Sequence, residues 1–218
     1  MAIRILLADD HRILREGLKK LIEEEEGFLV VGEAKDGLET VRLAQNFTPE
    51  MVIMDISMPG LNGIEATIRI LSEYPETKVI ALSMHRESKY VMGMLEAGAK
   101  GYLLKDCAFD EVIKAISTVA GGSNYLSPGI TDIVITESLN RMGKQVQTSA
   151  RSLLTQREIE VLQLLAEGIK SKEVGKQLFI SKKTVETHRR NIMQKLNLNS
   201  TAELVRFAIR EGITSVEK

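Results

Sequence analysis

The sequence predicts a chain of two parts, an α/β domain built on a five-stranded parallel sheet, followed by an all-α domain of four short helices. In the first half, short apolar runs alternate with stretches of helical periodicity, which is the pattern of a parallel sheet covered by helices. Four of the five runs end in polar residues. In the last third, amphipathic segments begin at residues that can cap a helix. A length of 218 residues with 44% hydrophobic side chains allows two cores of ordinary size.

The strands of the predicted sheet are short apolar runs bounded by polar or turn-forming residues. They are expected at residues 3–8, 28–31, 51–54, 79–82 and 102–104. Apolar residues recur at helical spacing between them. One face of the first interval carries Leu14, Leu18 and Ile22, and one face of the last carries Ile116 and Val119. Such stripes would pack helices against the sheet.

Polar side chains stand where four of these strands end. Asp9 and Asp10 follow the first strand, Asp55 the third, Ser83 the fourth and Lys105 the fifth. The carboxyl ends of parallel strands share one edge of a sheet, so these residues are expected to meet in one pocket. Clustered carboxylates repel one another and need a cation, for which Mg²⁺ is well suited. A carboxylate can also attack phosphorus while a lysine neutralises the phosphoryl oxygens, which makes Asp55 the candidate phosphoacceptor.

A nine-residue run makes this interpretation more specific. It extends from Asp55 through Ser57, Pro59 and Gly60 to Gly63, and combines an aspartate at a strand end with a Pro-Gly turn and a second glycine. The run resembles the phosphoacceptor loop of response-regulator receiver domains, and with the other strand-end residues the resemblance covers about residues 1–120. It implies an α/β flavodoxin-like receiver domain with the strand order 2-1-3-4-5.

The resemblance also implies a metal site beside the phosphoacceptor. Asp10, Asp55 and the backbone carbonyl of Ser57 would hold Mg²⁺, and Asp9 would support them. Asp55 would receive a phosphoryl group from a sensor histidine kinase, and Lys105 would bind that group.

A conformational switch is the third implication. Ser83 would donate a hydrogen bond to a new phosphoryl oxygen on Asp55 and draw its loop inward. Tyr102 would then turn toward the vacated space. Phosphorylation of Asp55 would thereby change the surface of the domain.

A loose segment separates the two predicted domains. Residues 127–129, with the sequence Ser-Pro-Gly, form a break, residues 130–139 have the pattern of one helix, and residues 143–152 are mostly polar. This composition is typical of a partly flexible tether. We therefore expect a first domain at residues 1–124, a linker at 125–150 and a second domain at 151–218.

Helix-capping residues divide the second domain. Thr155 with Glu158 forms a capping box that opens the first helix, and Ser171 and Ser181 can cap the second and third helices. Ser200 stands three residues before Glu203 in a second capping box and opens the last helix. The second and third helices follow each other through a short turn, as in a helix-turn-helix.

The third helix of this domain has one packing face and one polar face. Its packing face carries Val185, His188, Ile192 and Leu196. Its polar face carries Lys183, Glu186, Thr187, Arg190 and Gln194. The sequences around Thr155 and around this helix resemble the LuxR-type helix-turn-helix, and together with the receiver they match the NarL/FixJ subfamily of response regulators. The chain differs from the commonest wording of that family at Lys170, Ser171 and Gly175.

The resemblance implies that residues 182–196 enter the major groove of DNA. Glu186, Thr187 and Arg190 would lie nearest the bases, and Lys182, Lys183 and Arg189 near phosphates. Thr184 would also belong to the DNA-binding surface. The implied partners are operator DNA with two half-sites, a second copy of the chain after phosphorylation, and the sensor kinase, with RNA polymerase as a further candidate.

Charge and composition agree with this reading. Residues 151–218 hold 13 lysines and arginines against 8 acidic residues, whereas the preceding part has 16 against 22. The positive end suits a phosphate backbone, and the acidic part suits a divalent cation. The single cysteine, Cys107, excludes an internal disulfide, and no apolar run approaches the length of a membrane span. A cytoplasmic protein is expected.

Two enzyme classes are disfavoured and one regulatory alternative stays open. An aspartyl-phosphate phosphatase needs a second carboxylate two residues after its nucleophile, where this chain has Ser57. A dinucleotide-binding enzyme needs a glycine-rich loop after the first strand, where Asp9, Asp10 and His11 stand. The chain is thus not expected to be an enzyme. A constitutive DNA-binding protein whose receiver only dimerises would bind DNA equally with and without phosphorylation.

Overall fold

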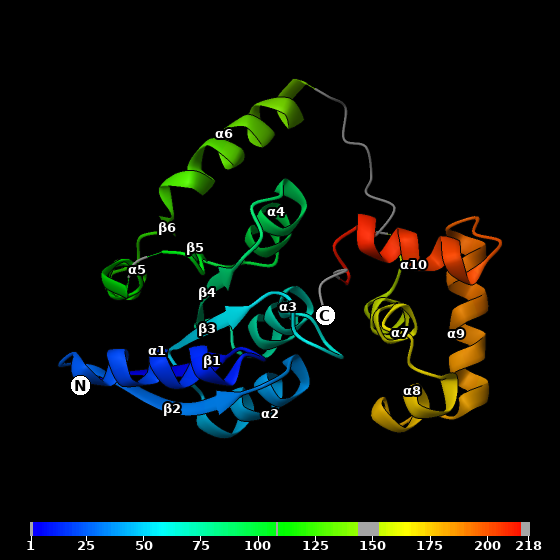
Figure 1. The fold of residues 1–218 in the computed structure, drawn as a ribbon, viewed down its shortest axis with the longest axis horizontal. Helices are drawn as coiled ribbons and strands as arrows, with labels where there is room; N and C mark the ends of the chain where they lie inside the picture. The colour runs from blue at the N-terminus through cyan, green and yellow to red at the C-terminus, as the bar shows by residue number, and fades with distance from the viewer. Residues whose placement is uncertain (1, 108, 144–152, 215–218) are drawn as a thin grey trace. The chain divides into compact units, whose positions relative to one another are not determined.

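The computed structural model describes residues 2–107, 109–143 and 153–214. The chain divides into two compact units, residues 1–143 and 144–218 (Figure 1). The strands of the first unit are β1 (Ile3–Ala8), β2 (Phe28–Ala34), β3 (Met51–Asp55), β4 (Lys78–Ser83), β5 (Gly101–Leu104) and β6 (Tyr125–Leu126). Its helices are α1 (Arg12–Glu24), α2 (Gly37–Phe47), α3 (Gly63–Glu73), α4 (Ser88–Glu96), α5 (Phe109–Ala120) and α6 (Pro128–Gly143).

All strands of the first unit form one parallel sheet in the order β2-β1-β3-β4-β5-β6. The predicted order 2-1-3-4-5 is confirmed, but the predicted number of five strands is wrong. The sixth strand is formed because the edge of β5 accepts a partner: Tyr125 N–H donates to Lys100 O (3.0 Å) and Ser127 N–H to Tyr102 O (2.9 Å). A run of two residues is too short to appear as a strand in the sequence pattern.

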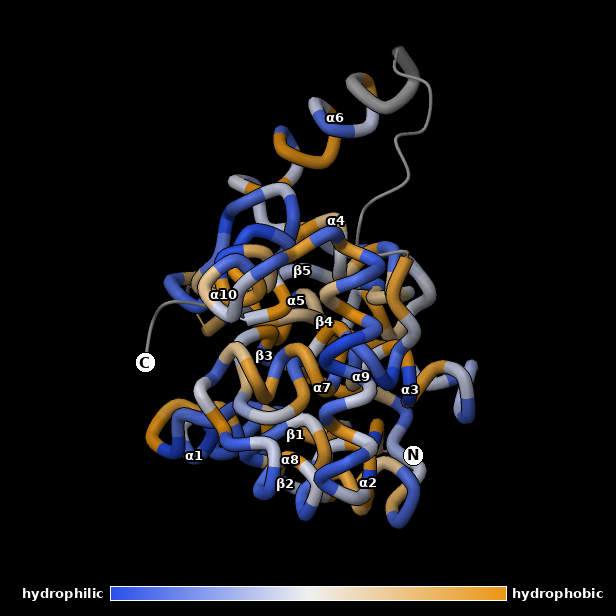
Figure 2. The backbone as a smooth tube through the Cα atoms, turned by 90° about the vertical axis from the view of Figure 1, so that its right-hand side faces the viewer, coloured by the Kyte–Doolittle hydropathy of each residue, from blue (hydrophilic) through white to orange (hydrophobic). Residues whose placement is uncertain are grey.

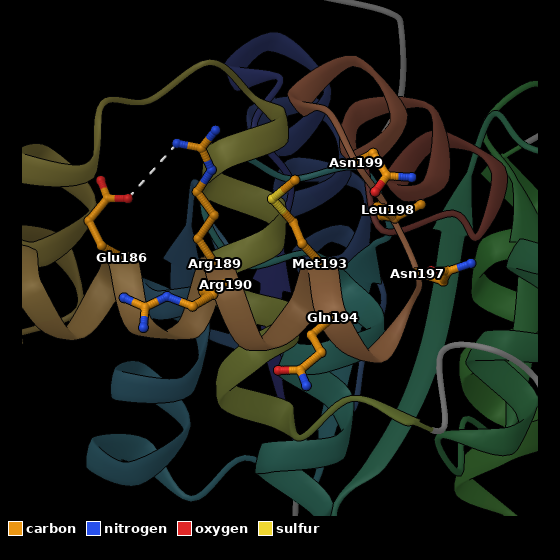
Figure 3. A pocket seen from close by; sticks show the side chains of 8 residues that line it. All are labelled: Glu186, Arg189, Arg190, Met193, Gln194, Asn197, Leu198 and Asn199. Carbon is orange, nitrogen blue, oxygen red and sulfur yellow. Dashed lines mark ion pairs between the residues drawn. The ribbon is translucent and has the colours of Figure 1, made fainter.

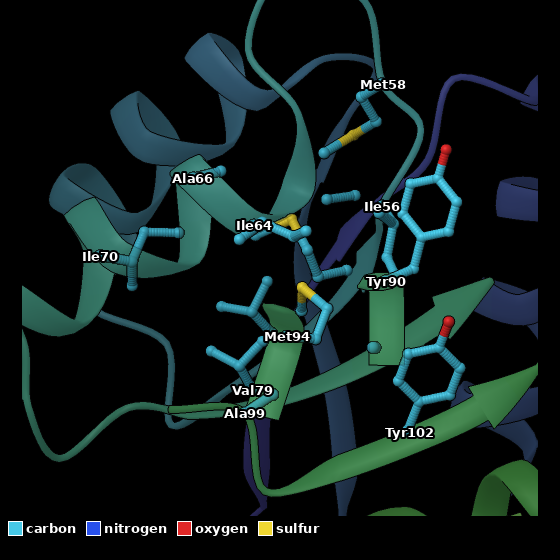
Figure 4. Close-up of a cluster of buried hydrophobic side chains, with 14 of the residues drawn as sticks. Ile56, Met58, Ile64, Ala66, Ile70, Val79, Tyr90, Met94, Ala99 and Tyr102 are labelled. Atoms are coloured by element: carbon cyan, nitrogen blue, oxygen red, sulfur yellow. The ribbon is translucent and has the colours of Figure 1, made fainter. Parts of the chain in front are cut away.

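Alternate residues of the strands feed two hydrophobic clusters, one on each face of the sheet. In β1, Leu6 belongs to the cluster that receives α2, α3 and α4, while Ile5 belongs to the cluster that receives α1 and α5. Figure 4 shows part of the first cluster, in which Tyr90 and Tyr102 lie with their hydroxyls toward the same side. The helix stripes predicted for α1 and α5 are buried as expected, since Ile22 and Ile116 are fully covered.

Residues 125–143, expected to lie in a linker, are a strand and a helix of the first compact unit. Ile130 of α6 is fully buried in the same cluster as Tyr102, and Ile133 and Val134 pack against that cluster. Figure 2 shows apolar segments alternating with polar ones along α6. Its apolar residues pack α6 against α4, a contact that composition alone did not indicate. The polar stretch expected at residues 143–152 lies largely outside the described residues.

The second unit contains α7 (Gln156–Ala166), α8 (Ser171–Gln177), α9 (Lys182–Lys195) and α10 (Thr201–Arg210) around one core. The predicted capping box is present: Thr155 N–H donates to Glu158 Oε2 (2.8 Å), and Glu158 N–H donates to Thr155 Oγ1 (3.3 Å). Lys195 Nζ, at the end of α9, lies 2.7 Å from the same carboxylate. Burial alone would raise the pKa of Glu158, but the hydrogen bonds from Lys195 and Thr155 lower it.

The helix starts were predicted correctly for α9 and α10 and wrongly for α8. Ser181 accepts a hydrogen bond from Thr184 N–H (3.0 Å), and Ser200 caps α10. The cap of α8 is Lys170, because the helix begins one residue earlier than expected and Ser171 is already inside it. Gly175, inside α8, lies close to the turn that follows the helix, since a Cβ there would lie 2.7 Å from the carbonyl oxygen of Ile180. Among the described helices, none combines the length and apolar character needed to cross a membrane.

Candidate functional site

The ends of β1 and β3 bring three carboxylates together. Asp9 and Asp55 are each 2% exposed, and Asp10 lies on the more open side of the group. Ligand atoms of these residues and of His11 all lie within 4.8 Å of one another. The convergence predicted from the parallel strands is therefore present in the structure. Oxygen donors so close together, two of them buried, form a set suited to a hard divalent cation.

Lys105 neutralises part of the negative charge of this pocket. It follows β5, and its Nζ lies 2.7 Å from Asp9 Oδ2 and 2.8 Å from Asp55 Oδ2. Its side chain is only 6% exposed. Burial lowers the pKa of Lys105, but the carboxylates of Asp55 and Asp9 outweigh burial and raise it. The lysine is therefore charged and directed at the carboxylate oxygens of Asp9 and Asp55.

Asp55 sits in an environment that disfavours the charged form of its carboxyl. Burial raises the pKa of its carboxyl, Asp9 raises it further, and Lys105 and the Ser57 N–H offset part of the effect. The Ser57 N–H donates to Asp55 Oδ1 at 3.3 Å. Gly63 is required behind this residue, because a Cβ at that position would lie 2.0 Å from the carbonyl oxygen of Asp55.

The two candidate switch residues lie on the neighbouring strands. Ser83, fully buried at the end of β4, is paired with Leu104 of β5. Tyr102 is also fully buried, and its hydroxyl donates to the carbonyl oxygen of His85 (2.8 Å). Burial raises the pKa of Tyr102, so its hydroxyl is a donor at neutral pH. The ring lies inward in this structure.

Two histidines beside the pocket were not predicted to take part. His11 Nδ1 lies 2.8 Å from Asp10 Oδ1 and 3.1 Å from Asp9 Oδ1. His85 Nε2 lies 2.7 Å from Ser57 Oγ. The adjacency of His11 to the two aspartates was visible in the sequence, but the approach of His85 to Ser57 depends on the packing of two loops.

Most of the predicted DNA-contacting side chains of α9 are exposed. The exposed ones are Lys182, Lys183, Thr184, Thr187 and Arg190. Glu186 and Arg189 are half-buried. Arg189 Nη2 donates to Thr201 Oγ1 at 2.7 Å, and its Nη1 lies 3.9 Å from Glu186 Oε2. Both line a hollow of about 590 Å³ together with Arg190 and Gln194 (Figure 3). Arg189 is thus held by α10, a contact that the sequence did not indicate.

Comparisons with known proteins agree with both halves of this description. The response regulator receiver domain matches residues 5–117, and the LuxR family of bacterial regulatory proteins matches residues 152–208. The transcriptional regulatory protein DegU of Brevibacillus brevis is 38% identical, covering 98% of this chain and 96% of DegU. The oxygen regulatory protein NreC of Staphylococcus carnosus is 38% identical, covering 97% of this chain and 99% of NreC. A solved RcsB–DNA complex is 25% identical with a TM-score of 0.58, covering 97% of this chain and 99% of RcsB.

A strand-end acidic pocket with a buried lysine, a capped helix-turn-helix, and relatives aligned over nearly the whole length lead to one assignment. The chain belongs to the two-component response regulators of the NarL/FixJ group, which join a receiver domain to a LuxR-type DNA-binding domain.

Proposed function

We propose that a sensor histidine kinase phosphorylates Asp55 and that this modification controls sequence-specific DNA binding by α9, and hence transcription. The observation that carries the proposal is the buried carboxylate of Asp55, 2.8 Å from Lys105 Nζ in a pocket with two further carboxylates. A structural ion pair alone would not need three acidic residues at one sheet edge. A phosphoryl acceptor with a divalent-cation site does.

The chain's own residues account for the transfer. An Asp55 Oδ oxygen attacks the phosphorus of a phosphohistidine, the new O–P bond forms as the N–P bond breaks, and the leaving imidazole takes up a proton from solvent. Lys105 neutralises charge on the phosphoryl oxygens. Asp10, Asp55 and the Ser57 carbonyl would hold Mg²⁺ with Asp9 in support. These residues would place Mg²⁺ where it would neutralise charge on the oxygens of the transferred phosphoryl group.

The exposed face of α9 supplies the proposed DNA contacts. Glu186, Thr187 and Arg190 would approach base edges, while Lys182 and Lys183 would meet phosphates. The likeness to RcsB, which was solved as a complex with DNA, supports this assignment.

Two further residues of the proposed DNA surface have bonds within the domain. The Thr184 hydroxyl lies 2.8 Å from Ser181 Oγ at the start of α9. Arg189 donates to Thr201 through Nη2 alone, which leaves its guanidinium further N–H donors for a phosphate. We propose that Arg189 contacts DNA from this position, held by the start of α10.

The proposed partners follow from the same reading. They are the sensor histidine kinase, operator DNA with two half-sites, and a second copy of the chain after phosphorylation, with RNA polymerase as a further candidate. Because the proposed ligand is operator DNA, we propose that the protein acts in the cytoplasm. We propose that the chain is a regulator and not an enzyme, because Ser57 supplies no general acid beside Asp55.

Phosphorylation can be tested with the full-length chain, Mg²⁺ and a small phosphodonor such as phosphoramidate. We expect one phosphoryl group per chain by intact-protein mass spectrometry, and none for Asp55→Asn. Asp110→Asn, which changes an exposed carboxylate at the start of α5, is the matched control and should be labelled fully. Undiminished labelling of Asp55→Asn would overturn the assignment.

The link to DNA is tested with an operator selected from a random DNA pool by the phosphorylated chain. We expect tighter binding and a dimeric mass after phosphorylation. Equal affinity and equal mass before and after labelling would favour the constitutive alternative, in which the receiver serves only for dimerisation.

A further inference from the structure

The side chain of His85 connects the phosphoacceptor loop to helix α4. Its Nε2 lies 2.7 Å from Ser57 Oγ, which is within hydrogen-bond distance. The other side of the ring stacks on Tyr90 of α4, with the ring centroids 4.0 Å apart and the planes inclined by 22°. The His85 side chain is only 13% exposed. The ring of His85 therefore connects Ser57, two residues after Asp55, to Tyr90 of α4.

The main chain of His85 is held by both candidate switch residues. Its N–H donates to Ser83 Oγ (3.1 Å), and its carbonyl oxygen accepts from the Tyr102 hydroxyl (2.8 Å). A serine hydroxyl can accept one hydrogen bond while it donates another. Ser83 can therefore donate to a phosphoryl oxygen on Asp55 and still hold the His85 N–H. Its displacement would then be passed to His85 through the main chain.

His85 cannot follow Ser83 without changing its side-chain contacts. Ser57 belongs to the loop after β3, whereas Tyr90 belongs to α4, so the two contacts tie the ring to different parts of the fold. A shift of the ring toward Asp55 must either pull Tyr90 with it or break the stack. Tyr90 lies in the same buried cluster as Ile130 of α6, the helix that precedes the DNA-binding domain in sequence.

We propose that His85 is a positioning residue that couples phosphorylation of Asp55 to movement of α4, and through α4 to α6. The proposal rests on the proposed function, because it needs Asp55 to be phosphorylated. It adds a residue outside the acidic pocket whose ring must keep two contacts at once. A histidine that merely fills space would affect folding stability equally in the two phosphorylation states and would leave their difference in DNA affinity unchanged.

Two substitutions separate the hydrogen bond to Ser57 from the stack on Tyr90; the third contact of the ring, from Nδ1 to Glu87 Oε2 at 3.6 Å, is to an exposed side chain. His85→Phe keeps an aromatic ring to stack on Tyr90 and removes the hydrogen bond to Ser57. His85→Gln keeps an amide within reach of Ser57 Oγ and removes the stack. Met84→Ala is the matched control, because Met84 is the preceding residue of the same loop and is 66% exposed. All are made in the full-length chain, and circular dichroism checks that each variant is folded.

The measured quantity is the ratio of operator affinities with and without phosphorylation, using the selected operator and phosphoramidate with Mg²⁺. Allosteric couplings commonly correspond to a ratio of about 5- to 150-fold, and we expect the unmodified chain and Met84→Ala to lie in that range. For His85→Phe and His85→Gln we expect the ratio to fall to about one, with phosphoryl incorporation still near one per chain. Hydrogen exchange across residues 88–96 should respond to phosphorylation in the control and not in these two variants.

Three results would overturn the proposal. An unchanged affinity ratio in His85→Phe would show that the contact to Ser57 carries no coupling, and an unchanged ratio in His85→Gln would show the same for the stack. Loss of phosphoryl incorporation in both variants would place His85 in the transfer step and not in its transmission. If the unmodified chain itself shows no affinity ratio above one, the proposed function fails, and that failure is recognised before any variant is measured.

Discussion

Replacing Gly63 by alanine should damage the first domain at the point where it presents Asp55. Gly63 is the first residue of α3, and its N–H donates to the carbonyl oxygen of Ile56 (2.9 Å). A Cβ would lie 2.0 Å from the carbonyl oxygen of Asp55 and 3.0 Å from the Cα of Ile56, whereas ordinary contact begins at 3.4 Å. Both neighbours are backbone atoms next to a buried strand and cannot rotate away. The strand end or the helix must therefore shift.

The expected destabilisation is at the upper end of overpacking effects, about 3 kcal/mol. Unfolding entropies near 2.1 cal/mol/K per residue, over about 140 residues, convert this into a Tm lower by about 10 °C. Gly17→Ala is the matched control. Gly17 lies inside α1, and a Cβ there meets nothing within 4 Å. The same chemical change should stabilise the helix by about 0.5–1 kcal/mol and raise the Tm by about 2–3 °C.

Thermal unfolding by circular dichroism measures both variants, and phosphoryl incorporation measures the effect on Asp55. Gly63→Ala should lose most labelling at temperatures where it remains folded, because its acceptor carboxylate is displaced from Lys105. Gly17→Ala should be labelled like the unmodified chain. A Gly63→Ala variant with an unchanged Tm and full labelling would refute the argument that this backbone approach positions the acceptor.

Further predictions concern the DNA-binding domain and α6. Glu158→Gln should cost about 1.5–3 kcal/mol at neutral pH, because it weakens a charged hydrogen bond. The pKa of Glu158 is lower in the folded than in the unfolded chain, so the carboxylate stabilises the fold at any pH above its unfolded-state pKa. This stabilisation is lost as the pH falls through the folded-state pKa. The stabilities of the Glu158→Gln variant and the unmodified chain should therefore converge in acid. Glu186→Ala should relax base preference at one position per half-site. Lys182→Ala should weaken binding to all single-base operator variants alike and reduce the salt slope by about one unit. The same uniform loss of affinity in both variants would contradict the division into base-reading and phosphate-contacting residues. Val134→Asp should lower the Tm of the first domain, because Val134 packs against its core. The control Ile135→Asp changes a residue that is 53% exposed and should leave the Tm nearly unchanged. Equal changes of Tm in the two variants would show that α6 does not pack against α4.

Local pattern was sufficient wherever one short segment dictates its own structure. The alternation of apolar runs and helical stripes predicted a parallel sheet, and Thr155 with Glu158 predicted the start of α7. The strand order 2-1-3-4-5 was implied by the resemblance to receiver domains and not by the alternation. The acidic pocket was also predictable, because the parallel strand direction places Asp9 and Asp55 at one edge whatever the details of packing. The start of α8 was missed by one residue, since Ser171 and the Lys170 before it are both compatible with the same periodicity.

Residue type and spacing were enough to identify the side chains of the pocket and of the α9 surface. Which of these side chains already bond to other parts of the chain follows from the packing of distant segments. Arg189 bonds to Thr201 because the turn after α9 brings the start of α10 beside it, and His85 meets Ser57 because the loops after β3 and β4 leave adjacent strands. The sixth strand and the position of α6 likewise depend on the pairing of β6 with β5 and on the buried cluster that takes up Ile130. Such contacts join residues far apart in the chain, and their energy depends on geometry that no local spacing encodes.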